Sequence, residues 1–180
     1  MKDGFLKAAA LSPALRVADC AYNVRQITDA LHKAAARGVK LAVFPEFCLT
    51  GYTCGDLFFQ QPLQRAAARG LAAVLEASAD LDLVALVGLP VAVDGKLYNC
   101  AAVLHRGRIL GIVPKTWLPN YDVFAEKRCF TSAAAYSGPG CVPVGGQDAP
   151  FGTGLVFACA QMPAFRLGVE LGEDVRAPVP

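Results

Sequence analysis

The sequence predicts an α/β fold built around a mixed β-sheet. Up to residue 79, apolar runs of strand length alternate with segments of helical periodicity, a pattern that is typical of α/β proteins. Three strand-like runs then follow one another between residues 83 and 113, separated only by the turns Asp94-Gly95 and Arg106-Gly107. Because strands joined by tight turns pair antiparallel, we expect a mixed sheet and not a purely doubly wound order.

The first strand is expected at residues 5–11, a short apolar segment. Asp19 is expected to cap the following helix, since an aspartate side chain accepts hydrogen bonds from the free amides of a first turn. Gly38 is expected to end that helix. Apolar residues recur between them at helical spacing: Val24, Ile27, Leu31 and Ala34.

A second helix is expected at residues 63–79, because Pro62 suits a helix start and apolar residues again follow helical spacing. Residues 83–93 are almost wholly apolar, as in a strand that is buried on both faces. Residues 96–104 and 108–113 are the other two strands of the antiparallel set. The segment 137–154 is rich in Gly and Pro and predicts a surface loop. Two last strands are expected at residues 155–160 and 165–171.

Composition narrows the class of protein. A chain of 180 residues that is 54% hydrophobic can bury a core as one domain. A net charge of +2 does not favour nucleic acid or an anionic membrane as a partner, and no uncharged apolar run is long enough to span a bilayer. Seven cysteines without CxxC spacing, beside two histidines, indicate reduced thiols and no metal site. An acid and a glycine within residues 1–4 do not suit a signal peptide, so a cytoplasmic location is expected.

The stretch 41–52 is the centre of the predicted fold. An apolar run ends at Pro45, which removes a donor from the strand ladder, and Glu46 follows at once. Glu46 therefore lies where a buried strand opens into a loop, a usual place for catalytic residues in α/β folds. The alternative is a loop acid that caps a backbone group or faces water.

Two further strand ends match this one. Lys115 follows Pro114 after an apolar strand, and Gly172 follows the last strand. The segments 44–46, 49–52 and 54–58, with 114–115, 118–121 and 126–130, resemble the nitrilase (carbon–nitrogen hydrolase) superfamily. They are most similar to the N-terminal glutaminase domains of glutamine-dependent NAD synthetases. The likeness covers nearly the whole chain and implies a nitrilase-like α-β-β-α sandwich with a mixed sheet, truncated at the C-terminus, so that residues 1–180 form an incomplete glutaminase domain.

The resemblance also implies roles for single residues. Glu46 matches the general base, and Lys115 matches the cation that stabilises the tetrahedral oxyanion. Glu126 matches a second glutamate, which orients the lysine or the substrate ammonium. Tyr52 and Tyr121 match aromatic residues that line the glutamine pocket. From the residues alone, both tyrosines could instead be half-buried loop anchors.

The third member of the catalytic set is missing. The family motif reads Gly-Val-Glu-Ile-Cys-Glu-Asp-Leu-Trp, whereas residues 168–176 read Gly-Val-Glu-Leu-Gly-Glu-Asp-Val-Arg. Gly172 stands at the nucleophile position, and glycine has no side chain that could form a thioester. Cys48 and Cys159 are poor substitutes, because attack geometry is demanding and both are expected to be small buried residues.

The resemblance implies an enzyme: a glutaminase that supplies ammonia for ATP-dependent NAD synthesis from deamido-NAD. We expect no cofactor in this domain, since ATP and deamido-NAD belong to a synthetase domain that this chain lacks. Expected partners are glutamine or a small amide, that synthetase domain and further copies of the chain. Two alternatives stay open: a non-catalytic binding or assembly remnant, favoured by Gly172, and a stand-alone nitrilase-like amidase.

Overall fold

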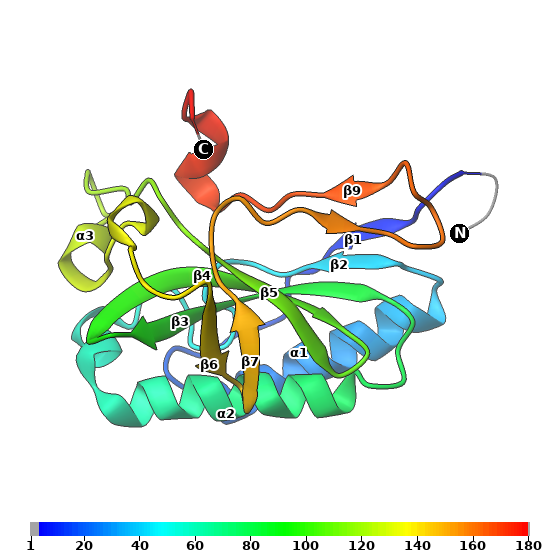
Figure 1. Ribbon diagram of the computed structural model, residues 1–180. Coiled ribbons are helices and arrows are strands. Elements are labelled where there is room, and N and C mark those ends of the chain that lie inside the picture. The colour runs from blue at the N-terminus through cyan, green and yellow to red at the C-terminus, as the bar shows by residue number, and fades with distance from the viewer. Residues whose placement is uncertain (1–3, 180) are drawn as a thin grey trace.

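The computed structural model describes residues 4–179, and the expectation drawn from the first four residues falls largely outside them. The described part forms a five-stranded sheet in the order β1-β2-β3-β4-β5 (Figure 1). Its strands are β1 (Ala8–Ala10), β2 (Leu41–Val43), β3 (Val84–Val93), β4 (Lys96–His105) and β5 (Arg108–Pro114). The pairs β1–β2 and β2–β3 are parallel, whereas β3–β4 and β4–β5 are antiparallel. The predicted mixed sheet is confirmed, with a first strand shorter than expected.

Two long helices, α1 (Cys20–Ala36) and α2 (Gln61–Ala77), lie along one face of the sheet (Figure 1). The Asp19 side chain accepts a hydrogen bond from the Tyr22 amide at 3.0 Å, which confirms the predicted cap of α1. Gly38 follows the helix with φ of +74°, a conformation that favours glycine. Every helix in the described part of the chain is too short or too polar to cross a membrane.

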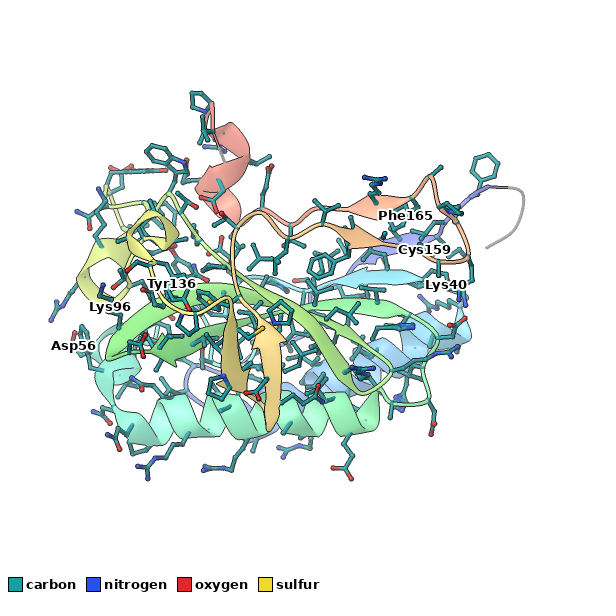
Figure 2. The ribbon with its side chains drawn as sticks, in the orientation of Figure 1. Lys40, Asp56, Lys96, Tyr136, Cys159 and Phe165 are labelled. Carbon is teal, nitrogen blue, oxygen red and sulfur yellow. The ribbon has the colours of Figure 1, made fainter. Side chains whose placement is uncertain are left out.

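The main core lies between the sheet and these helices, where side chains fill the space (Figure 2). Ile27 and Leu31 of α1, with Leu71 and Val74 of α2, are fully or almost fully buried there. Strand residues that point to the same face complete this core, among them Val87, Leu89, Cys100, Ala102 and Leu104. The helices thereby cover one face of the sheet.

The prediction of a surface loop at residues 137–154 is wrong. The segment contains a hairpin of β6 (Cys141–Val144) and β7 (Gln147–Pro150), and it packs beside β5 and over α2 (Figure 1). Val142, Val144 and Ala149 are buried in the main core. Gly145 and Gly146 form the turn with φ of +57° and +80°. The high Gly and Pro content masked an alternation of buried and exposed residues that is typical of strands.

The two last strands are much shorter than predicted. They are β8 (Phe157–Ala158) and β9 (Arg166–Leu167), which pair with each other on the face of the sheet away from the helices (Figure 1). Leu171 is buried against Ala101 and Val113 of the main sheet. Gly172 therefore follows an extended segment and not a regular strand, and packing against β4 and β5 fixes its position.

Candidate active site

Glu46 lies in the loop after β2, which packs closely on β3. The contact depends on Gly88, because a Cβ there would lie 2.5 Å from the Phe47 nitrogen and 2.6 Å from the Pro45 oxygen. Phe47 has φ of +52°, so the chain turns sharply just after Glu46. The Leu49 amide donates to the Gly88 carbonyl at 3.3 Å. After this tight turn, the carboxylate of Glu46 lies within hydrogen-bond distance of Asn99 and Lys115.

Lys115 follows β5 and is almost completely buried, with 2% of its side chain exposed. Its Nζ donates to Glu46 Oε2 at 3.0 Å and to Glu126 Oε1 at 2.9 Å. Its backbone amide donates to the Asn99 carbonyl at 2.8 Å, which extends the pairing between β4 and β5. The two strand ends predicted to carry chemistry do meet. Since a buried ammonium needs paired anions, the two carboxylates account for its burial.

Glu126 begins α3 (Glu126–Cys129), a single short turn, and is buried. Tyr52 donates its hydroxyl to Glu126 Oε1 at 2.6 Å. The pKa of the Tyr52 phenol is raised well above its usual range, mainly by burial and next by this hydrogen bond to the carboxylate. Below this pair, the ring of Phe47 stacks on that of Phe130 at 4.9 Å between centroids. The aromatic contact holds α3 against the Glu46 loop.

Asn99 belongs to the same cluster, although sequence reasoning did not single it out. Its Nδ2 donates to Glu46 Oε2 at 2.7 Å and lies 3.4 Å from Glu126 Oε2. The side chain is fully buried. The available signal was one amide within the apolar strand at residues 96–104, since a polar side chain in such a run needs a polar partner.

Gly172 begins η3 (Gly172–Arg176) with φ of +50°. A Cβ added there would lie 2.5 Å from Glu46 Oε1 and 2.9 Å from Lys115 Nζ. The structure thus brings the third predicted position into direct contact with the other two. Asp174, a second residue that sequence reasoning missed, is buried and accepts hydrogen bonds from the Thr116 and Trp117 amides at 3.1 Å and 2.6 Å. It fastens η3 to the segment that follows Lys115.

Tyr121 lies outside this cluster. Its hydroxyl donates to Glu173 Oε1 at 2.6 Å, and about half of the residue is exposed, at 49%. Its ring makes an edge contact with that of Phe124, which in turn contacts the ring of Tyr52. Tyr121 is therefore a rim residue, linked to the buried cluster through Phe124.

Neither alternative thiol is placed for attack. Cys48 is fully buried, donates to the Gly88 carbonyl at 3.6 Å, and has its pKa raised to about 12, mainly by burial. Cys159 lies at the β8–β9 hairpin close to Lys40, at the opposite end of the sheet from α3 (Figure 2). It is partly exposed, so the expectation that it is buried is wrong.

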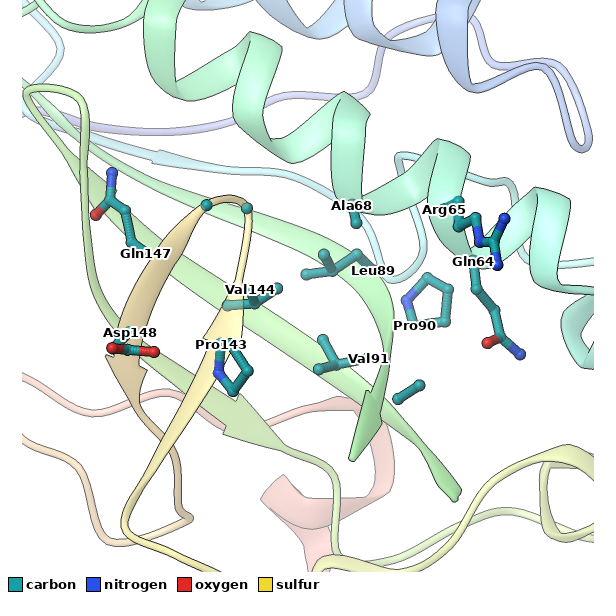
Figure 3. Close-up of a pocket in the computed structure, with 13 residues that line it drawn as sticks. Gln64, Arg65, Ala68, Leu89, Pro90, Val91, Pro143, Val144, Gln147 and Asp148 are labelled. Atoms are coloured by element: carbon teal, nitrogen blue, oxygen red, sulfur yellow. The ribbon is translucent and has the colours of Figure 1, made fainter. Parts of the chain in front are cut away.

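The larger cavities of the molecule lie elsewhere. One of about 590 Å³ separates α2 from the β6–β7 hairpin (Figure 3). Its walls carry Arg65 and Asp148, and a second cavity of about 650 Å³ adjoins the β8–β9 hairpin. Neither is lined by the Glu46–Lys115 cluster, so volume alone does not mark the site. A smaller cavity of about 220 Å³ adjoins Glu126 and Tyr52. Within residues 4–179, no group of three or more His, Cys, Asp or Glu side chains could hold a metal ion.

The arrangement can transfer protons and stabilise negative charge. Glu46 is partly exposed, at 25% of its side chain, whereas Lys115 and Glu126 are enclosed. A carboxylate at the surface of such a site can accept a proton, and a fixed ammonium beside it can stabilise an oxyanion.

Comparisons with known proteins agree with this geometry. The model of the carbon–nitrogen hydrolase family matches residues 7–179. A glutamine-dependent NAD(+) synthetase from Mycobacterium tuberculosis is 39% identical over 177 residues, which cover 98% of this chain and 26% of that protein. One from Thermotoga maritima is 38% identical over 122 residues, or 68% of this chain and 21% of that protein.

Solved structures show the same fold. The glutamine-dependent NAD(+) synthetase from Cytophaga hutchinsonii superposes with a TM-score of 0.78 at 27% identity, over 91% of this chain and 27% of that one. An amidase from Nesterenkonia sp. AN1 superposes with a TM-score of 0.62 at 20% identity, over 82% and 55% of the two chains. The chain spans about a quarter of the length of the M. tuberculosis relative, 26%.

Proposed function

Because the chain belongs to the carbon–nitrogen hydrolase family, we propose that Glu46, Lys115 and Glu126 are the catalytic cluster of a glutaminase domain. The observation that carries the proposal is the convergence of these three side chains with position 172 at one end of the sheet. Glutamine is the proposed substrate, since the relatives at 38–39% identity are glutamine-dependent enzymes. The ammonia would serve NAD synthesis, for which ATP and deamido-NAD would bind at a separate synthetase domain.

In this mechanism the cluster divides the chemistry among its members. In a chain with a nucleophile at position 172, Glu46 would take its proton, since Glu46 Oε1 is the oxygen nearest to that position. Lys115 stabilises the oxyanion of the tetrahedral intermediate. Glu126 holds the ammonium of Lys115 in place and accepts a hydrogen bond from the hydroxyl of Tyr52. Tyr52 and Tyr121 contribute to the wall and rim of the glutamine site.

The same geometry supports the proposal that the chain as it stands does not hydrolyse glutamine. Gly172 offers no nucleophile, and Glu46 Oε1 and Lys115 Nζ approach the space in which a side chain at 172 would begin. Loss of the nucleophile from a catalytic set removes almost all of the rate. A second function, amide binding without turnover, is therefore a specific alternative that Gly172 favours.

Two further proposals concern the setting of the domain. We propose a cytoplasmic location, which is supported by seven cysteines that are all free thiols. We also propose self-association, since several large apolar side chains are exposed, among them Val123 at 89% and Val175 at 68%.

Thermal melting with glutamine tests the binding part of the proposal. Glutamine at about 100 times its dissociation constant should stabilise the folded chain by about 2.7 kcal/mol, which corresponds to a rise in Tm of roughly 5–10 °C. Lys115→Met should abolish the rise, and so should replacement of glutamine by an amino acid without a side-chain amide. A glutamine response that is identical in Lys115→Met would place the binding site elsewhere.

A further inference from the structure

Asn99 connects the candidate catalytic groups through both its backbone and its side chain. Its carbonyl accepts the Lys115 amide at 2.8 Å, and its Nδ2 donates to Glu46 Oε2 at 2.7 Å and reaches Glu126 Oε2 at 3.4 Å. The side chain is fully buried in β4. The side-chain nitrogen of Asn99 thus contacts the same two carboxylates, of Glu46 and Glu126, that pair with Lys115.

The other end of the amide shows what determines its orientation. Asn99 Oδ1 is buried and has no hydrogen-bond partner among residues 4–179. Buried acceptors without a donor are rare in folded proteins, because the lost hydration is not replaced. Rotating the amide by half a turn would set Oδ1 against both carboxylates and remove the N–H donor from Glu46. The orientation is therefore the one that serves the carboxylates, at the expense of Oδ1.

We propose that Asn99 is a positioning residue for Glu46: its amide N–H fixes the carboxylate toward position 172 and Lys115. The proposal rests on the proposed role of Glu46 as general base. The other charged or titratable groups near Glu46 are Lys115, which contacts it from the end of β5, and Glu126 and Tyr52, which lie behind Lys115. Asn99 donates its hydrogen bond to Glu46 from the interior of β4, whereas these three groups lie in loops or at the ends of elements.

A carboxyl–amide exchange tests the contact in the unmodified Gly172 background. Asn99→Asp keeps the shape of the side chain but places a third carboxylate in the cluster, so its Tm should fall by about 10 °C. The double variant Asn99→Asp with Glu46→Gln restores one amide and one carboxylate in exchanged places, with the original net charge. It should recover at least half of that loss. Gln147→Glu is the matched control, since Gln147 is a half-buried amide bound to Gly107 and Ile109, and its combination with Glu46→Gln should be additive.

Several outcomes would overturn the proposal. An unchanged Tm in Asn99→Asp would show that only shape matters at this position, and additive losses in the double variant would show that the two side chains are not paired. If Asn99→Asp does not fold, a folded double variant supports the pairing. An unfolded double variant beside a folded Glu46→Gln contradicts it.

A kinetic measurement separates positioning from a purely structural role. In a Gly172→Cys background, Asn99→Asp should lower kcat for glutamine by about 100-fold or more with little change in KM, because the base is displaced while the substrate site is kept. A loss confined to KM would contradict the positioning role. If a folded Gly172→Cys variant that binds glutamine is itself inactive, the proposed function fails, but the melting experiment still decides whether Asn99 holds Glu46.

Discussion

Replacing Gly88 by alanine should displace the loop that carries Glu46, because this loop packs directly on Gly88. A Cβ at this position would lie 2.5 Å from the Phe47 nitrogen, 2.6 Å from the Pro45 oxygen and 2.9 Å from the Glu46 Cα. All three are backbone atoms, so relief requires the loop to move by about 0.9 Å to reach an ordinary contact of 3.4 Å. Overpacking of this kind costs about 3 kcal/mol, which should lower Tm by roughly 6–12 °C.

The assay for Gly88→Ala combines thermal melting with kinetics in a Gly172→Cys background. Gly154→Ala is the matched control, since a Cβ there meets nothing within 4 Å and its φ is not positive; its Tm should stay within about 1 °C or rise slightly. Gly88→Ala should also lower kcat by about 100-fold, because Glu46 moves with the loop. A Gly88→Ala protein with unchanged Tm and unchanged kcat would refute the view that this close approach positions Glu46.

Three other predictions concern single groups. Lys115→Met leaves two carboxylates without their ammonium and should lower the free energy of unfolding by about 3–5 kcal/mol in urea titrations; a loss under 1 kcal/mol would contradict the buried ion pairs. The raised pKa of Tyr52 keeps its proton in the folded state, so its contribution to stability is full below pH about 10, the unfolded value, and is lost as pH rises beyond it. Tyr52→Phe should therefore show a smaller alkaline loss of Tm than the unmodified chain, and equal losses would disprove the linkage. Cys48, with a pKa of about 12, should resist maleimide at pH 8 in the folded chain while exposed Cys141 reacts, as mass spectrometry would show; rapid labelling of Cys48 would refute its burial.

Sequence reasoning found Glu46 and Lys115 because each has a clear local signal. An apolar strand that ends at a proline leaves the next residue at the sheet edge, and this placed Glu46 and Lys115 correctly relative to the strands. Both residues lie at the same end of the sheet because β2 and β5 run in the same direction. The tight turns after β3 and β4 revealed this topology.

Asn99 and the β6–β7 hairpin escaped prediction for different physical reasons. Asn99 can be recognised as a site residue only when the register of β4 and β5 is known. This register pairs its carbonyl with the Lys115 amide and thereby sets its side chain beside Glu46. The hairpin was hidden because its strands are short and its turn, Gly145-Gly146, has the composition of a loop. The length of the last strands was overestimated, because apolar residues in an extended segment pack on the sheet without pairing.

Ammonia release from glutamine by the unmodified chain and by its Gly172→Cys variant tests the central claim most directly. The unmodified chain should be inactive, and the variant should release ammonia once Glu46 and Lys115 shift to admit the new side chain. Gly172→Cys combined with Glu46→Gln should lose that activity and serves as the control. Ammonia release by the unmodified chain, or silence of a folded Gly172→Cys variant that binds glutamine, would contradict the assignment of Glu46, Lys115 and position 172 as one catalytic set.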